Sequence, residues 1–406
     1  MKRLAQFLCQ YEIWFVAAFL GASVIQVGFL FPAVAAILIF WPVRRVAAGQ
    51  WGARTPVDVA GLLLVAMLPV TLWASAIPEI TVPQVLRLLT GIGFFYAIIN
   101  WAGTPRRVQG LAWGVGAAAV GLAAFALVSA AWAQGKFAFI PAALVSDSIH
   151  PNVLGGSLAL LMSGLGAVFL WGLGKISWVR LLAGAVIFSG MAGVLWVSQS
   201  RGALLALGLA SLLLVALRWR WGILGFVAAG AAGWALLLRL GGADLLAGLM
   251  FGHGVSGGIG GRLELWQRAI YMIQDFPWTG VGMGLYGEAA ENLYPLVLFE
   301  GTVPHAHNLV LQVGVDLGLP GLVAWLAIFL LVCRAGWRLY RMGRRDGSAW
   351  LAGLGAGAMG VQVVLMVHGI FDAVTWGMVR PAPLVWGLWG VVIAALRVAE
   401  AGKGES

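Results

Sequence analysis

Residues 349–371 read AWLAGLGAGAMGVQVVLMVHGIF, an apolar run without Asp, Glu, Lys or Arg. A transmembrane helix needs about 20 mostly apolar residues, and this run is long enough to cross a bilayer. The rest of the chain has the same character, because 61% of its 406 residues are hydrophobic, 10% are charged and the mean hydropathy is +0.94. A soluble domain has roughly a quarter of its residues charged. We therefore expect an all-α polytopic membrane protein.

The length rule predicts about 12 transmembrane helices, with both termini in the cytoplasm. The expected spans are residues 12–26, 27–42, 57–74, 84–101, 109–132, 151–173, 178–197, 202–217, 221–239, 320–337, 349–371 and 382–398. Lys and Arg collect on the cytoplasmic side of membrane proteins, and this topology places most of the 25 basic residues there. No polar mature segment follows the first apolar run after Lys2 and Arg3, which favours an uncleaved first span over a signal peptide.

Three parts follow from this topology. Residues 1–239 are expected to form an N-terminal transmembrane bundle of about nine spans, and residues 320–406 about three further spans with a short cytoplasmic tail. Between them, residues 240–319 form a large periplasmic loop with amphipathic helices. One such helix is predicted by an apolar stripe at helical spacing, which consists of Leu263, Trp266, Ile270 and Ile273.

A break is expected where this loop returns to the membrane. A single helix over residues 308–337 would be about 45 Å long at about 1.5 Å per residue. That length exceeds the bilayer and would place Gln312 and Asp316 near lipid. We therefore predict a short interfacial helix from Asn308, a break at Gly318–Gly321, and a span with Pro320 in its first turn.

Several basic residues fall outside the predicted cytoplasmic segments, where a cation costs free energy unless it has a partner. They are Arg87, Lys136, Arg201, Arg239, Arg262, Arg268 and Arg380. Arg239 closes a span and can extend its charged end to the membrane surface. Lys136 fits this structural role and a functional role equally well. Arg268 follows Glu264 by four residues, the spacing of a helical ion pair. Arg262 stands at a predicted helix N-terminus, where the macrodipole disfavours a cation unless it serves an anionic partner.

Three short motifs accompany these residues. They are Ser200-Arg201-Gly202, Gly261-Arg262 with Trp266 and Pro277-Trp278-Thr279-Gly280-Val281-Gly282, and His307-Asn308 followed after residues 309–317 by Gly318-Leu319-Pro320-Gly321. Together they resemble the O-antigen ligase and O-antigen polymerase superfamily over residues 195–340. The resemblance implies a glycosyltransferase of the bacterial inner membrane that moves an undecaprenyl-diphosphate-linked glycan at the periplasmic face. The acceptor is lipid A–core in ligases and another lipid-linked repeat in polymerases.

The resemblance, together with the chemistry of these side chains, assigns candidate roles. His307 matches the motif and would take the proton of the acceptor hydroxyl, with His305 as the alternative base. Arg201 and Arg262 would bind the donor diphosphate and stabilise the charge that develops on it. Further substrate-binding candidates are Arg380, His305, Arg87 and Arg268. Displacement of an α-linked diphosphate would invert the anomeric centre.

The expected partners are the lipid-linked donor, the lipid A–core acceptor and membrane lipids. No Asp-x-Asp pair and no convincing zinc set is present, so we expect a metal-independent enzyme without a cofactor. The net charge of +10 does not indicate nucleic-acid binding, because the basic residues do not form one patch. Cys9 and Cys333 lie far apart near predicted cytoplasmic ends, which excludes a disulfide framework.

Two other functions are possible for a multi-pass membrane protein of this kind. A transporter or flippase would show internal repeats and charges at the bilayer midplane, whereas here one long loop on one face carries the motifs. A polymerase of the same superfamily is the nearer alternative, and the single large outer loop favours a ligase. Arg87 and Asp372 either line a donor cavity, or pair with each other or with a backbone carbonyl as packing residues. The same alternatives apply to His368, and His150 is expected to be structural.

Overall fold

The computed structural model describes residues 1–129, 150–173, 177–239, 242, 259–298, 303–379 and 381–404. These residues are mostly α-helical, and no β-strand occurs among them, which confirms the all-α prediction. The helices are α1 (Lys2–Ile25), α2 (Leu30–Ala48), α3 (Asp58–Ala74), α4 (Pro78–Trp101), α5 (Pro105–Ser129), α7 (Pro151–Gly172), α8 (Trp178–Ser198), α9 (Arg201–Arg218), α10 (Gly222–Arg239), α12 (Ile259–Asp275), α13 (Tyr286–Asn292), α14 (Leu309–Arg345), α15 (Ala349–Phe371) and α16 (Ala382–Gly404).

Within the described residues, 10 helices are long and apolar enough to cross a membrane. The helices α3 and α10 are also apolar but contain shorter apolar stretches. Each expected span overlaps one of these helices, and the chain is therefore a multi-pass membrane protein. The total of about 12 spans and their orientation remain predictions.

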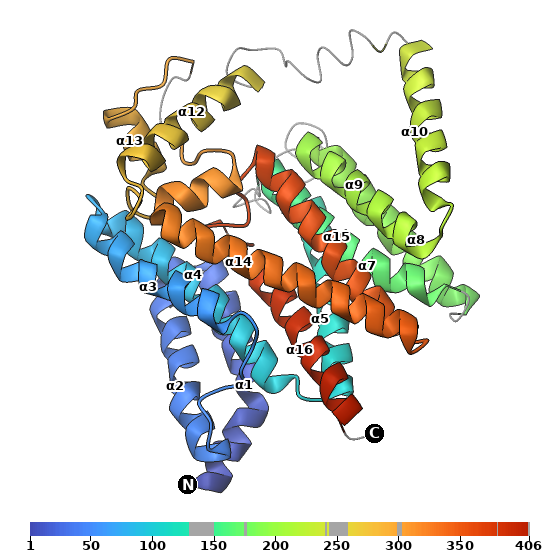
Figure 1. The fold of residues 1–406 in the computed structure, drawn as a ribbon, viewed down its shortest axis with the longest axis horizontal. Coiled ribbons are helices and arrows are strands. Elements are labelled where there is room, and N and C mark those ends of the chain that lie inside the picture. Colours follow the sequence, from blue (N-terminus) through green and yellow to red (C-terminus); the bar gives the residue numbers. More distant parts are fainter. Residues whose placement is uncertain are drawn as a thin grey trace.

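Two helices form the centre of the bundle. The helix α15 packs against α14, α7 and α9, whereas α4 packs against α16, α2 and α1. Small residues allow the closest of these approaches, since a Cβ on Gly355 of α15 would lie 2.2 Å from the backbone nitrogen of Tyr340 on α14. Close helix contacts through small residues are typical of membrane proteins. Figure 1 shows α12 and α13 at one end of the bundle and both chain termini toward the other.

The expected break in α14 is present at Gly318. This residue has φ of 67° and ψ of −175° inside the helix, a backbone conformation that glycine adopts without steric cost. A Cβ at this position would lie 2.8 Å from the carbonyl oxygen of Pro277. The same oxygen accepts a 2.7 Å hydrogen bond from the N–H of Leu319. The motif of residues 277–282 therefore packs against the motif of residues 318–321, and this contact holds the loop on α14.

The amphipathic helix α12 exists, but only part of the predicted stripe lies on its buried face, since Trp266 and Ile273 pack against a small core there. Leu263 and Ile270 are 54% and 44% exposed, whereas Leu265, Ala269 and Met272 are buried in a small core shared with α13 and α14. The prediction relied on large apolar side chains. Close packing against a neighbouring helix instead selected a face that contains a small alanine, because a short side chain lets the backbones approach.

Candidate functional site

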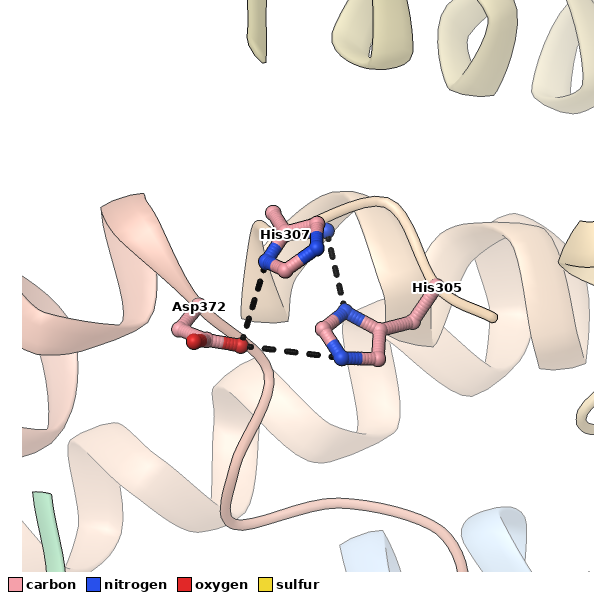
Figure 2. A group of neighbouring side chains, drawn as sticks. All are labelled: His305, His307 and Asp372. Carbon is pink, nitrogen blue, oxygen red and sulfur yellow. Dashed lines mark hydrogen bonds and ion pairs between the residues drawn. The ribbon is translucent and has the colours of Figure 1, made fainter. Parts of the chain in front are cut away.

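Two histidines from the segment before α14 meet a carboxylate at the end of α15. Figure 2 shows His305 and His307 beside Asp372. The Nδ1 atom of His307 lies 3.4 Å, and the Nε2 atom of His305 lies 3.7 Å, from the same Oδ1 of Asp372. The Asp372 side chain is buried, whereas the side chains of His305 and His307 are 24% and 26% exposed. A ligand can therefore reach the cluster from the histidine side.

The residues around His307 fix its position. The side chain of Asn308 caps α14 by accepting a 3.0 Å hydrogen bond from Leu311 N–H, and its Nδ2 donates to the carbonyl oxygen of Ile370 at 3.3 Å. His307 has a φ of 47°, in the left-handed region that costs free energy for a residue with a Cβ. Its N–H donates to Nδ1 of His305 at 3.2 Å. Backbone strain of this kind is concentrated at functional sites.

Two further hydrogen bonds hold the carboxylate of Asp372 in place. Its Oδ1 accepts a 2.8 Å hydrogen bond from the N–H of Ala373, and its Oδ2 accepts one of 2.8 Å from Nδ2 of Asn152 on α7. Burial raises the pKa of Asp372, but the side chain of His307 and the charges of the surrounding histidines outweigh burial and hold the pKa below its usual range. Asp372 is therefore an anion that faces the two imidazoles.

His305 is a weak base in this arrangement. Burial, together with the neighbouring His307, lowers the pKa of His305 to about 4, against the opposite effect of Asp372. Because its Nδ1 accepts the N–H of His307, a neutral His305 carries its proton on Nε2, the atom that faces Asp372. A general base works best with a pKa near the operating pH. These properties make His307 the better candidate for the base.

Arg201 begins a helix that packs against the end of α15. The next residue, Gly202, lies so close that a Cβ would be 3.3 Å from Cβ of Phe371 and 3.5 Å from Cδ2 of His368. The glycine of the Ser-Arg-Gly motif therefore lets α9 approach the last turn of α15. This contact places Arg201 beside the segment that carries Asp372.

Arg262 and Arg268 lie on α12 in different surroundings. Arg262 is in the first turn of α12 and within electrostatic range of His368. Arg268 lies 3.7 Å from Glu264, which confirms the expected i,i+4 pair. The structure thus places Arg262 within electrostatic range of His368, one helical turn before Asp372.

Arg87 has a structural partner. It is buried, and its Nη2 donates to the carbonyl oxygen of Ser23 at 2.7 Å. The backbone carbonyl of Ser23 is therefore one partner of this intramembrane arginine, and the contact joins α4 to α1. The candidate Arg380 and the ambiguous Lys136 lie outside the described residues.

Comparison with known proteins shows a family match over the region that contains most of the candidate site residues. A family model described as O-antigen ligase matches residues 186–326. This region belongs to the O-antigen ligase and polymerase superfamily. No curated protein sequence matches the chain significantly. The matched O-antigen ligase region contains Arg201, Arg262, His305 and His307, whereas Asp372 comes from a helix beyond it.

Asp372 also completes a set of groups that can hold a metal ion. Among the described residues, one ligand atom from each of His305, His307 and Asp372 lies within 4.8 Å of the others. Two imidazoles and a carboxylate match the ligand types and the number of protein ligands in catalytic zinc sites. The sequence alone offered two histidines without a carboxylate, because Asp372 lies far along the chain. Metal-independence therefore stays a prediction that chelation tests.

A buried polar network behind the cluster was not apparent from the sequence. Asp316 accepts hydrogen bonds of 3.0 Å from Gly284 N–H, 2.9 Å from Gln312 Nε2 and 2.7 Å from Trp376 Nε1. The side-chain oxygen of Gln312 accepts the N–H of Ala306, between the two histidines, at 2.8 Å. The network joins the loop before α13, the first part of α14 and the segment after α15. It therefore holds the histidines and the Asp372 segment at a fixed separation.

Proposed function

We propose that the chain is an O-antigen ligase. It would transfer an undecaprenyl-diphosphate-linked O-antigen glycan onto lipid A–core at the periplasmic face of the inner membrane. The observation that supports this most is the cluster of His305, His307 and Asp372 beside the helix starts that carry Arg201 and Arg262. A base and anion-binding groups on one face of a membrane protein are what one-sided transfer from a lipid diphosphate requires.

In the proposed reaction, His307 is the general base. Its Nδ1 faces Asp372 at 3.4 Å, so the Nδ1 proton would point to the carboxylate and leave Nε2 free to accept a proton. A buried carboxylate in this position holds the tautomer and stabilises the imidazolium that forms. His305 would act as a positioning residue, because its Nδ1 holds the backbone of His307.

The transfer step exchanges one bond at C1 of the glycan for another, and the arginines stabilise the leaving group. The acceptor hydroxyl oxygen forms a new bond to C1 of the glycan while the bond from C1 to the diphosphate oxygen breaks. The hydroxyl proton moves to Nε2 of His307, and undecaprenyl diphosphate leaves with the electron pair. Arg201 and Arg262 would stabilise the growing negative charge, because guanidinium groups bind phosphate oxygens in pairs and stay charged. The attack from the opposite face inverts C1, and no step needs a metal ion.

Product identification tests the proposal. Purified protein is incubated with lipid-linked glycan and lipid A–core, and the products are identified by mass spectrometry. Glycosylated core supports a ligase. Extended lipid-linked glycan with untouched core would show the polymerase alternative instead. The absence of both products, from protein that binds the donor, would contradict transfer altogether.

The variant Asp372→Asn tests the role of the carboxylate. It keeps the shape of the side chain but removes the charge that faces the imidazoles. We expect transfer to fall by roughly 10²–10⁴-fold, because the wrong tautomer of the base is then favoured. Unchanged turnover in a folded Asp372→Asn protein would remove Asp372 from the mechanism.

A further inference from the structure

The end of the bundle that carries the chain termini contains a cavity of about 960 Å³. The helices α1, α2, α4 and α16 and the segment between α2 and α3 form its walls. Its charged and polar lining includes Cys9, Glu12, Arg44, Arg54, Asn100 and Arg397. The volume is within the range of small-molecule sites, about 300–1,000 Å³. The cavity lies far from the histidine cluster and needs its own explanation.

Positive charge exceeds negative charge in this cavity. Both carboxylate oxygens of Glu12 accept hydrogen bonds from Arg44, at 2.8 Å and 3.1 Å, so this pair is neutral overall. Arg54 is exposed and, among the described residues, has no hydrogen bond or ion pair. Arg397 donates to a backbone carbonyl over a long 3.4 Å. Two guanidinium groups therefore line the cavity with unused donors, which suits a phosphate or another anion.

An apolar groove of about 370 Å³ adjoins the charged cavity. The two share Arg44, Arg54 and the residues Trp51, Gly52 and Ala53. The groove is lined by α2, α3 and α4, with Val34, Ile37, Leu62, Val65, Leu89 and Ile92 in its walls. Along α2 it extends from Val34 to Arg44, which is about 15 Å at about 1.5 Å per residue. One leaflet of the hydrocarbon core is also about 15 Å deep.

Two tryptophans mark the level at which cavity and groove meet. Trp51 lines both and is 59% exposed, while Trp41 lines the groove and is 43% exposed. Tryptophan is enriched at the membrane–water interface, where its ring lies at the level of the lipid headgroups. The charged cavity then lies at headgroup level, and the groove lies at the level of the acyl chains.

We infer that this end of the bundle binds one anionic phospholipid, with its phosphate on Arg54 and Arg397 and an acyl chain in the groove lined by α2, α3 and α4. A zwitterionic lipid carries its own cation, which the two arginines would repel, so an anionic headgroup is preferred. The bound lipid would bridge α2 and α3 and stabilise the folded state by mass action. The inference is independent of the proposed transfer reaction.

Cys9 lines the cavity and can report its occupancy. The other cysteine, Cys333, lies on α14 and lines neither the cavity nor the groove. A Cys333→Ala protein therefore has a single thiol at Cys9. We would purify it in neutral detergent, titrate it with palmitoyl-oleoyl phosphatidylglycerol and measure the rate of maleimide labelling. Bound lipid should slow the labelling of Cys9.

Two kinds of variant test the headgroup and the chain separately. Each arginine near an anionic headgroup contributes about fivefold in affinity, so Arg54→Gln with Arg397→Gln should raise the half-protecting lipid concentration about 25-fold. The matched control, Arg344→Gln, changes an exposed arginine on α14 outside the cavity and should leave it unchanged. At Gly61, in the groove, a Cβ would meet only the hydroxyl of Tyr96 at 3.5 Å. Gly61→Leu should therefore fill the groove and weaken protection.

Other ligands decide what the site recognises. Inorganic phosphate at the same phosphorus concentration should protect Cys9 poorly, and equal protection would reduce the site to an anion site without a lipid chain. Equal protection by phosphatidylcholine would contradict the charge argument. Stronger protection by undecaprenyl phosphate would show that the site binds the carrier lipid and would overturn the assignment to a phospholipid. If no lipid slows labelling, or if the arginine variants bind as well as the Arg344→Gln control, the inference is wrong.

Discussion

Two buried carboxylates, one at each end of the bundle, are built in different ways. Glu12 is 2% and Asp372 is 3% exposed. Arg44 binds both oxygens of Glu12, at 2.8 Å and 3.1 Å, in the fork geometry of a strong ion pair. Asp372 instead presents one oxygen to two imidazoles at 3.4 Å and 3.7 Å. These distances exceed those of an ordinary hydrogen bond, about 2.7–3.2 Å.

The difference separates a structural pair from a reactive one. A buried ion pair whose hydrogen bonds are all made has nothing left to offer a ligand, and its loss leaves an uncompensated charge. The groups at Asp372 keep unused capacity, because the buried Nδ1 of His307 has no hydrogen bond within the described part of the chain. A backbone in the left-handed region at His307 adds strain that the fold must support. We therefore expect changes at the two ends to have opposite effects on activity and on stability.

The arginines beside the Asp372 end should give the largest effect. Arg262→Ala and Arg201→Ala are expected to abolish transfer while the protein inserts and purifies normally, because the leaving diphosphate loses its charge stabilisation. Lysine should rescue either position poorly, since it cannot bind two oxygens at once. Initial rates of glycan transfer measure the effect. Full activity in one of the alanine variants would exclude that arginine from the site.

His307→Ala should lower turnover by about 10²–10⁴-fold, the usual contribution of a general base. Donor binding should persist, because the arginines hold the diphosphate, and the loss should shrink at alkaline pH as the acceptor hydroxyl ionises. His305→Ala serves as the milder comparison. If donor affinity falls together with turnover in His307→Ala, then His307 binds the diphosphate and is not the base.

Glu12→Ala should lower the stability of the protein and leave its activity unchanged, the reverse of the effect expected for the site variants. Removing one partner of a buried pair costs about 3–5 kcal/mol, because Arg44 is left buried without its counter-ion. Activity per folded molecule should stay the same, since Glu12 lies at the other end of the bundle. Thermal unfolding and transfer assays on the same preparation separate the two quantities. A double variant, Glu12→Leu with Arg44→Met, should recover much of the stability, and its failure to do so would argue against a simple ion-pair role.

The stability of the Asp372 end should depend on pH through His305. Its pKa is lowered to about 4 in the folded protein, whereas an unfolded histidine titrates near about 6.5. The unfolded chain therefore binds the proton first, and stability is complete above about pH 6.5 and declines as the pH falls toward about 4. The unfolding temperature of His305→Gln should decline less over this window than that of the parent. If the unfolding temperatures of the two proteins fall equally with pH, His305 is not the group responsible.

The smallest expected effect is that of chelation. Exhaustive EDTA treatment should leave transfer unchanged, because the proposed step uses a base and two arginines and needs no metal ion. The set of His305, His307 and Asp372 makes this a demanding test, since its ligand types suit zinc. Complete loss of activity that a divalent ion restores would assign the cluster to metal chemistry.

Much of the fold followed from local patterns. Apolar runs of bilayer length predicted the helices, because burial of apolar side chains in lipid depends mainly on composition over about 20 residues. The break at Gly318 was predictable from the length of the run and its Gly-Leu-Pro-Gly sequence. The ion pair of Glu264 and Arg268 followed from helical spacing. The buried face of α12 followed only in part, for Trp266 and Ile273, because the remainder depends on which neighbouring helix leaves room for Ala269.

The sequence by itself determined that this is an all-helical membrane protein with a histidine motif, since these features depend on composition and on residues close together in the chain. Only the tertiary structure decided their partners. It brought Asp372 from the end of α15 to His305 and His307, gave Arg87 the carbonyl of Ser23, and joined Asp316 to Trp376. Such contacts link segments far apart in sequence. They arise from the packing of whole helices, which no local pattern records.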